Sequence, residues 1–397
     1  MIIGILILIV FFLSFAYMKR EKFLNYIIIG TLFRLLLIGF YFIGVQIPES
    51  GGDAKNFFYE GRAIFDYLFF GGDKIQIINP YSNVIGFSMV YSGDNIGLAL
   101  LMNTICYIVI AFSIYEIVKL LTEVDRKAAL KAVIIMTFFP IDILYSAVLL
   151  REQTIIMFLI LSFWFLLRYI KKGIFFEFLI SVLFHVLAVL FHSGILFLLA
   201  VHLYVLVFYR KKVRVVKFKA VKTIAISILG FGLFKILVKT QKFAFLKDIF
   251  NIEYLNHVVV GRFLASTGTG RTVYLMNLVP TNLVQFILYL PIRIVYFLFA
   301  PFIWMVGGAA DIFVLVDGGL YLILIFFAYK GLKELEPKIR KAVLIYFFAF
   351  SVVFSIGTTN YGTAMRHRHK ILWLVVAVAV IPKRKLAVKR EQSIGNN

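Results

Sequence analysis

The feature that most constrains this chain is a series of apolar runs, many of them close to 20 residues long. An α-helix needs about 20 apolar residues to cross the hydrocarbon core of a bilayer. The composition agrees, because 62% of the residues are hydrophobic and only 16% are charged, whereas about a quarter are charged in a typical soluble domain. The sequence therefore predicts an all-α, polytopic integral membrane protein.

About eleven membrane-spanning helices follow from this criterion of length. They are expected at about 2–18, 24–46, 95–121, 129–148, 150–168, 173–190, 192–209, 221–239, 309–329, 341–357 and 370–382. The last is short for a span, so it could also begin inside the charged cluster at 360–370. Residues 1–397 are treated as one transmembrane domain. Its longest connections lie at about 47–94 and 240–308.

Lysine and arginine predict the orientation of these helices. Basic connections recur after nearly every second predicted helix, as expected for cytoplasmic loops under the positive-inside rule. They are residues 19–22, 126–131, 168–172, 210–222, 330–341 and 383–390. The same rule explains the net charge of +22, so no nucleic-acid partner is expected. A multi-pass membrane protein is predicted, in contact with membrane lipids.

One apolar segment, at about 284–306, does not fit this alternation. It carries Pro291, Arg293 and Pro301, which make a straight span unfavourable. We expect it to be re-entrant or interfacial on the outer side of the membrane. Alternatively, this segment could cross the membrane twice in two short passes, which would also preserve the orientation of the other helices.

The predicted outer side collects arginines where the positive-inside rule disfavours them. They could be scattered loop charges that touch lipid head groups. Alternatively they form an electropositive cavity, since arginine binds phosphate oxygens with two parallel hydrogen bonds and keeps its charge. The candidate substrate-binding arginines are Arg62, Arg151, Arg262, Arg271, Arg293, Arg366 and Arg368.

Asp53 is a candidate catalytic residue in the first outer connection. It follows Gly51 and Gly52, which could present its carboxylate from a tight turn. It could act as a general base on an acceptor hydroxyl, or orient an arginine. Alternatively it only begins a short interfacial helix.

Three further candidates lie at outer helix ends. Glu152 would be stabilised by the dipole of the helix that it begins, and it could hold Arg151 in an ion pair. His192 could be a hydrogen-bonded cap or assist the acceptor. His367 and His369 alternate with arginines, which lower their basicity, so they could be neutral donors or acceptors near pH 7.

Other polar residues carry weaker signals. Arg34 lies near the middle of a predicted span, which marks it as functional unless it pairs with a buried acid such as Asp142. His185 and His202 do not share a metal-ligand spacing with His192, so no metal site is predicted.

Absent motifs narrow the chemistry. There is no glycine-rich phosphate loop that ends in Lys-Ser or Lys-Thr, which argues against an ATPase. No predicted cytoplasmic loop is long enough to fold a nucleotide-sugar domain. An enzyme that works on the outer side requires a different activated donor, and a lipid-linked phosphate or pyrophosphate meets that requirement. No cofactor is expected.

The chain resembles Wzy-type O-antigen and capsular polysaccharide polymerases and the EpsG-like exopolysaccharide proteins. The resemblance rests on the membrane topology and on short motifs. These are Gly52-Asp53 with Tyr59, Pro140 with Tyr145-Ser146, Leu150-Arg151-Glu152, Phe191-His192-Ser193-Gly194, and Asn360-Tyr361-Gly362-Thr363 with Arg366-His367-Arg368.

The resemblance implies a GT-C-like membrane glycosyltransferase that polymerises repeat units linked to undecaprenyl pyrophosphate. It also implies that the protein lies in a bacterial cytoplasmic membrane, with its active site facing outside. Arg151, Arg271, Arg366 and Arg368 would bind the pyrophosphate. His192, His367 or Asp53 would assist the acceptor hydroxyl. A chain-length regulator and a flippase would be candidate partners.

Two alternatives stay open. An essential outer aspartate such as Asp53 is typical of GT-C transferases that use a polyprenyl-phosphate sugar, which need not be polymerases. A flippase or exporter of the lipid-linked glycan would instead distribute polar residues along a path through the helices. The sugars, their linkage and the type of polysaccharide are not encoded in any motif.

Overall fold

The structure is a computed structural model that describes residues 22–71, 79–209, 253 and 270–383. Its described regular elements are helices, and one isolated antiparallel bridge joins Val273 to Asn360. The helices are α2 (Lys22–Phe42), α3 (Gly52–Phe70), α4 (Pro80–Ser92), α5 (Gly97–Leu121), α6 (Arg126–Phe138), α7 (Pro140–Tyr145), α8 (Glu152–Lys172), α9 (Phe175–Phe191), η1 (Ser193–Leu198), α10 (Leu199–Phe208), α13 (Leu283–Phe299), η4 (Ile303–Met305), α14 (Ala309–Glu334), α15 (Pro337–Ile356) and α16 (Tyr361–Ala379).

Five of the described helices are long and apolar enough to cross a membrane, and they are α2, α5, α8, α14 and α15. Shorter apolar helices, among them α9, accompany them. The chain is therefore an all-α, polytopic membrane protein, as the apolar runs predict. The predicted helices at 2–18 and 221–239 lie outside the described residues.

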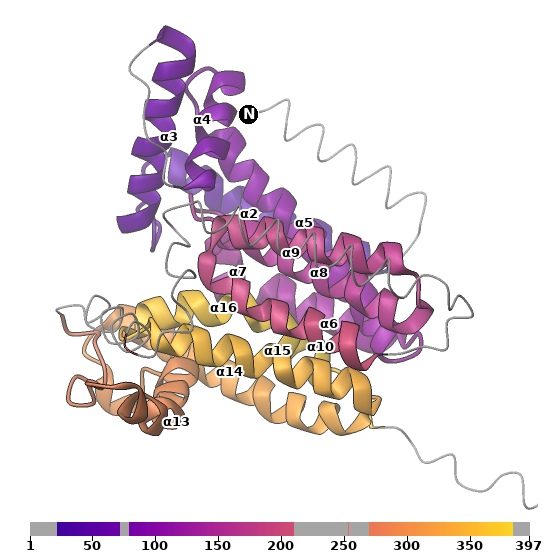
Figure 1. The fold of residues 1–397 in the computed structure, drawn as a ribbon. Helices are drawn as coiled ribbons and strands as arrows, with labels where there is room; N and C mark the ends of the chain where they lie inside the picture. The colour runs from indigo at the N-terminus through magenta and orange to yellow at the C-terminus, as the bar shows by residue number, and fades with distance from the viewer. Residues whose placement is uncertain (1–21, 72–78, 210–252, 254–269, 384–397) are drawn as a thin grey trace, which may run out of the picture.

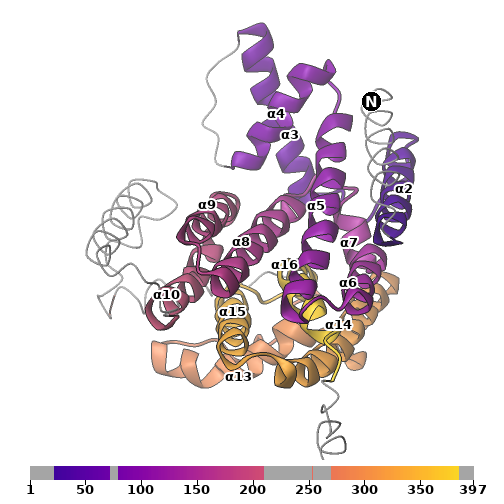
Figure 2. The ribbon, with the colours of Figure 1, turned by 90° about the vertical axis from the view of Figure 1, so that its right-hand side faces the viewer.

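Helix α16 is the centre of the bundle. It packs against α5, α6, α8, α13, α14 and α15, and Figure 2 shows it enclosed by its neighbours. Every residue from Arg368 to Val378 is buried. Trp373, the largest fully buried side chain, contacts the rings of Phe163 and Tyr346 at centroid distances of 5.3 and 5.8 Å. A helix that is apolar on all sides needs such an enclosed position.

One predicted helix is wrong, and a cap defines the start of the last one. The segment 129–148 is not one helix, because the chain becomes extended at Phe139, where α6 ends and α7 begins. Pro140 explains the break, since proline pushes the preceding residue out of the helical region. Of the two starts considered for the last helix, the structure has the one inside the charged cluster, at Tyr361, because the side chain of Asn360 caps its first turn.

The predicted outer connection 47–94 has helical structure of its own. It contains α3 and α4, which pack together as a hairpin and stand away from the bundle (Figure 1). Gly61 and Gly86 permit this contact, since an added Cβ would lie 2.5 Å from Ile85 and 2.6 Å from Ile64, respectively.

The second long connection, 240–308, is described only in part. From residue 270 onward it contains α13 and η4. Helix α13 keeps Pro291 inside its 17 residues and lies against α14, α15 and α16, at the end of the bundle where α14 and α16 begin (Figure 1).

The two ends of the bundle differ in charge. One end gathers the basic residues Lys171 and Lys172 of α8, Lys333 of α14 and Lys338 of α15. There, Lys171 lies 3.9 Å from Glu336, just before α15. At the other end, α8, α14 and α16 begin and bring acidic and basic side chains together. This second end holds the candidate site.

Candidate active site

A buried loop positions the start of α8. Residues 147–150, between α7 and α8, are almost completely inaccessible to solvent. Buried carbonyl groups need hydrogen-bond donors, and Asn103 of α5 supplies one. Its Nδ2 donates to the carbonyls of Val148 and Leu150 at 2.7 and 3.2 Å. The loop thereby fixes where Arg151 and Glu152 enter the bundle.

Helix α16 sorts the basic residues of 366–370 onto different sides. Successive residues on a helix differ in direction by about 100°, so positions four apart share a face. Arg366 and Lys370 both point to Glu152 at the start of α8. Arg368 points to Asp317 of α14. A cationic patch in the sequence is thus divided among several partners.

Arg366 joins two carboxylates from distant segments. Its Nε donates to Glu152 Oε1 at 2.7 Å, and its Nη1 donates to Asp53 Oδ2 at 2.6 Å. Lys370 Nζ lies 3.3 Å from the same oxygen of Glu152. We call Asp53, Arg151, Glu152, Arg366 and Lys370 the polar cluster.

Asp53 enters the polar cluster from the first turn of α3. Gly52 has φ of +46°, a left-handed value that glycine tolerates best. With Gly51, Leu150, Glu49 and Arg366, these two residues line a cavity of about 250 Å³. Half of the Asp53 side chain is exposed, and its Oδ1 makes no hydrogen bond within the described residues. A carboxylate oxygen is therefore free to accept a proton.

Arg151 is the cation of the cluster that lacks an acceptor. Its buried Nε has no hydrogen-bond partner among the described residues. The guanidinium lies 5.5 Å from the centre of the Phe57 ring. Burial holds the pKa of Arg151 below its ordinary value, against the opposing effect of Glu152. A bound anion would supply the missing partner.

Glu49 lies on the rim of the cavity and adds negative charge. Although its side chain reaches the surface, desolvation of the carboxyl raises its pKa, and Arg366 opposes that shift. Its backbone has φ of +66°, an uncommon conformation for a residue with a side chain. Strained residues of this kind concentrate at functional sites.

His192 and His367 meet at the edge of the cluster. Their ring centroids are 5.4 Å apart, and both rings lie against Phe354 at 5.0 and 4.8 Å. His367 Nδ1 lies 2.8 Å from Lys370 Nζ. These two predicted residues, which are far apart in the sequence, therefore share one aromatic contact beside the cations.

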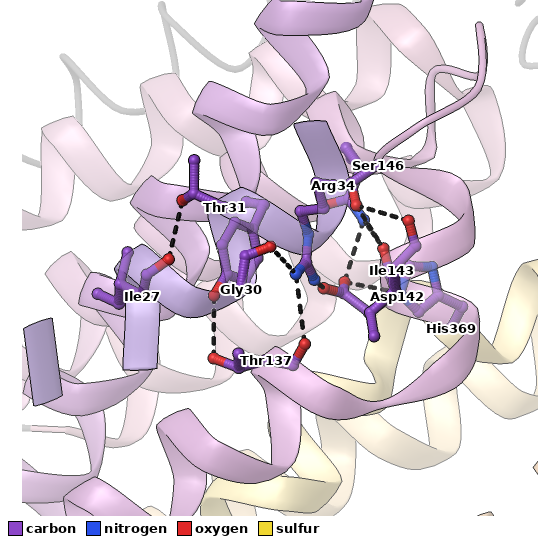
Figure 3. Close-up of polar contacts among 11 residues, drawn as sticks. Ile27, Gly30, Thr31, Arg34, Thr137, Asp142, Ile143, Ser146 and His369 are labelled. Atoms are coloured by element: carbon purple, nitrogen blue, oxygen red, sulfur yellow. Dashed lines mark hydrogen bonds and ion pairs between the residues drawn. The ribbon is translucent and has the colours of Figure 1, made fainter. Parts of the chain in front are cut away.

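A second polar network holds the helices beneath the cluster. Arg34 of α2 pairs with Asp142 of α7, and both side chains are fully buried (Figure 3). Asp142 Oδ1 also accepts from Gln153 Nε2 and contacts His369 Nε2, at 3.0 Å in each case. Since Gln153 and His369 adjoin Glu152 and Lys370 in sequence, this network fixes the relative position of α8 and α16.

The other candidate arginines lie outside the polar cluster. Arg368 is buried, pairs with Asp317 at 2.7 Å and donates to the carbonyl of Ala300 at 2.9 Å. Arg271 pairs with Asp311, which also accepts from Tyr361 at 2.8 Å.

The three remaining candidate arginines are also not members of the polar cluster. Arg62 is partly exposed and pairs with Asp66 and Asp94. Arg293 is buried and donates to the carbonyl of Ser355 at 3.3 Å. Arg262 lies outside the described residues.

Some residues of the site carried no recognised signal in the sequence. Lys370 was part of the cationic stretch, yet only the start of α16 at Tyr361 places it on the face of Arg366. Glu49 precedes the glycine pair, and Asn103 lies within an apolar run. A polar residue in the middle of a predicted span is the one signal that could have selected Asn103. Among the described residues, no three His, Cys, Asp or Glu side chains gather as ligands for a metal ion.

The fold is that of a multi-pass membrane protein, and the polar cluster lies at one end of its helices. Residues 81–232 match the model of a family described as dolichyl-phosphate-mannose-protein mannosyltransferase. This stretch contains Arg151, Glu152 and His192, and it ends before α16. The match supports a glycosyltransferase of the GT-C type, a class that acts on lipid-linked substrates in membranes. No curated protein matches the chain.

Proposed function

We propose that the protein transfers a sugar from a polyprenyl-phosphate donor to an acceptor hydroxyl at the polar cluster. The observation that carries this proposal is the contact of Arg366 with Asp53 at the cavity, because it joins an anion-binding group to a possible general base. The matched mannosyltransferase family supports a monophosphate-linked donor. The acceptor and the sugar are not defined by any residue described.

The chemistry follows from the roles that these side chains suit. The acceptor hydroxyl attacks the anomeric carbon of the donor and passes its proton to Asp53. The bond between the anomeric carbon and the phosphate oxygen breaks, so the departing phosphate gains negative charge. Arg366 and Arg151 stabilise that charge, an effect that is large in a site shielded from water.

Arg366 is suited to exchange one partner for the phosphate. Its contact with Glu152 is buried, whereas Asp53 is half exposed. An ion pair with an exposed partner is worth only about 0–1 kcal/mol. A donor phosphate can therefore replace Asp53 on Nη1 and leave the carboxylate available as the base, while Glu152 still holds the guanidinium in place.

The repeat-unit polymerase expected from the resemblance remains the second candidate. It would bind a pyrophosphate, for which four arginines were expected. Two of these, Arg151 and Arg366, belong to the polar cluster, while Arg271 and Arg368 pair with their own carboxylates. The smaller set of available cations favours a monophosphate donor.

A gene deletion separates the two functions. The surface glycans of the deletion strain would be compared by gel and by mass spectrometry with those of strains that carry the wild-type chain, Asp53→Asn or Asp66→Asn. Asp66 is the matched control, because it lies on α3 like Asp53 but pairs with Arg62 away from the cavity.

The proposed transferase predicts that deletion removes one sugar from the glycan, or truncates the repeat unit at that sugar. Asp53→Asn should reproduce the loss, and Asp66→Asn should restore the wild-type glycan. Complete single repeat units without longer chains would identify a polymerase instead. A glycan unchanged by deletion would contradict both functions.

A further inference from the structure

Helix α13 packs on α14, α15 and α16 at the end of the bundle where α14 and α16 begin (Figure 1). The contacts there are close. A Cβ added to Gly318 of α14 would lie 2.9 Å from the carbonyl oxygen of Phe299, and Arg293 donates to the carbonyl of Ser355 in α15 at 3.3 Å. Toward the other, basic end of the bundle, the space between α14 and α15 is a groove.

The groove has a buried floor and an aromatic rim. It holds a cavity of about 190 Å³, lined by the second half of α14, the first half of α15 and the last turns of α16. The buried residues Ala328, Leu374 and Val378 form its floor, whereas Tyr329 and Phe348 on its rim are more than half exposed. Every residue that lines the cavity is aliphatic or aromatic. Such a lining favours hydrocarbon over a polar ligand.

Two lysines adjoin the basic end of this groove. Lys333 Nζ lies 4.4 Å from the centre of the Tyr329 ring, which lines the cavity. Lys341 shares a face of α15 with Leu344 and Phe348, three and seven residues later, and both of these also line the cavity. Both lysines are exposed. Positive charge therefore lies where the apolar groove ends.

The basic connection 330–341 has a net positive charge around the two lysines. Its five cations outnumber its two acids. The cations are Lys330, Lys333, Lys338, Arg340 and Lys341, and the acids are Glu334 and Glu336. Glu336 also lies 3.9 Å from Lys171 of α8, which offsets part of its charge. The connection is therefore complementary to an anion.

The size and the chemistry of the groove together indicate its occupant. A cavity of about 190 Å³ has no room for another helix, which is about 10–12 Å wide with its side chains. An acyl chain is thinner and is apolar along its length. In a phospholipid, a phosphate follows the chain at its polar end. Basic pockets between membrane helices are known sites for anionic lipid head groups.

We propose that the groove binds an acyl chain of an anionic phospholipid whose phosphate contacts Lys333 and Lys341. The lipid occupies, at the basic end of the bundle, the space between α14 and α15 that α13 covers at the other end. It thereby supports α16, the helix that carries Arg366 and Lys370. The site is separate from the polar cluster and does not depend on sugar transfer.

The charge of the head group can be tested by native mass spectrometry, which counts the lipids bound to the purified full-length protein in detergent. Wild type would be titrated with phosphatidylglycerol and, separately, with phosphatidylcholine that has the same acyl chains. The test variant combines Lys333→Gln with Lys341→Gln. Both are exposed residues, so their replacement should leave the fold intact.

The matched control combines Lys330→Gln with Lys338→Gln, which removes the same charge from the same connection. Lys330 Nζ lies 4.0 Å from the centre of the Phe326 ring, and Lys338 Nζ lies 5.0 Å from that of Tyr209. Neither ring lines the groove. The two double variants therefore differ in the position of the lysines and not in net charge.

Wild type should bind phosphatidylglycerol more tightly than phosphatidylcholine. The double variant of Lys333 and Lys341 should bind phosphatidylglycerol roughly 30-fold more weakly, about fivefold for each lysine, and should bind phosphatidylcholine as wild type does. The control variant should match wild type for both lipids. Equal losses in the two double variants, or equal affinity of wild type for the two lipids, would overturn the proposed head-group site.

The acyl chain is tested by narrowing the groove. Ala328→Leu adds three carbons at the floor, so it should weaken the binding of both lipids. Glycerol phosphate, which has the charge without the chain, should not compete with phosphatidylglycerol. Competition by glycerol phosphate, or wild-type lipid binding by Ala328→Leu, would overturn the proposed role of the groove. The lysine variants still decide the proposal if Ala328→Leu does not fold.

Discussion

Glu152 shows how a single residue determines what its neighbours can do. A fully buried carboxylate is costly unless it is paired and hydrogen-bonded. Glu152 meets that requirement through Arg366 and Lys370. The guanidinium of Arg366 is consequently held in one orientation, with Nε directed at Glu152 and Nη1 at Asp53. Such preorganisation is what makes a cation effective toward a departing phosphate.

Replacement of Arg366 should therefore affect catalysis more than the loss of one charge would suggest. Arg366→Ala is expected to lower the rate of sugar transfer about 10²–10³-fold, the typical cost of removing one preorganised donor. Arg366→Lys should recover little, because lysine cannot contact Glu152 and a phosphate with separate fixed donors. Transfer of a radiolabelled sugar by isolated membranes measures both variants.

Arg62→Ala is the control for this experiment. Arg62 belongs to α3 and pairs with Asp66 and Asp94 at the surface. Its replacement should leave the transfer rate near that of the wild type. Equal rates for Arg366→Ala and Arg62→Ala would remove Arg366 from the proposed site.

At the scale of elements, the site depends on how α7, α8 and α16 are joined. Asp142 of α7 contacts Gln153 of α8 and His369 of α16, and Arg34 ties the same carboxylate to α2 (Figure 3). Helices in a membrane gain little from hydrophobic attraction, so packing and polar contacts between them decide their relative positions. This network therefore sets the register on which the polar cluster depends.

Asp142→Asn tests the network. The variant keeps the size of the side chain but leaves Arg34 as an unpaired buried charge, which costs about 3–5 kcal/mol. A clear fall in the midpoint of thermal denaturation in detergent is expected. Adding Arg34→Gln to Asp142→Asn removes the unpaired charge and should recover part of the loss.

Asp94→Asn provides the comparison, since Asp94 pairs with Arg62 in an exposed ion pair. Exposed pairs contribute about 0–1 kcal/mol, so the midpoint of thermal denaturation of Asp94→Asn should stay close to that of the wild type. If Asp142→Asn and Asp94→Asn melt at the same temperature, the buried pair does not stabilise the junction of these helices.

At the scale of the whole molecule, the two ends of the bundle differ in charge, and this difference favours one orientation in the membrane. The end opposite the polar cluster holds the lysines of α8, α14 and α15, and such clusters usually face the cytoplasm. We propose on this basis that the polar cluster faces outward. That side has no supply of nucleotide-activated sugars, which is consistent with a lipid-linked donor.

Cysteine labelling can test this orientation. Cys106 is buried, so the wild-type chain should react little with a membrane-impermeant maleimide. Tyr59→Cys, at a position with 63% exposure on α3, should be labelled in intact cells. Lys172→Cys, at the basic end of α8, should be labelled only after the membrane is permeabilised. The opposite pattern would place the polar cluster in the cytoplasm.

The sequence alone determined the class of fold. Apolar runs of about 20 residues in α2, α5 and α14 have no stable place in water, and the bilayer forces them into helices because it offers the backbone no other hydrogen-bond partners. Local signals such as the glycines before Asp53 and the acid at the start of α8 also identified parts of the candidate site.

Only the tertiary structure decided which charges meet. Arg366 and Arg368 are two residues apart in sequence, yet the helical rotation of α16 sends one to Glu152 and the other to Asp317. Asp53, Glu152 and Arg366 lie far apart along the chain, and they meet because α16 packs against α8 and the first turn of α3 reaches Arg366. No local pattern encodes such contacts, because they depend on how whole helices pack together.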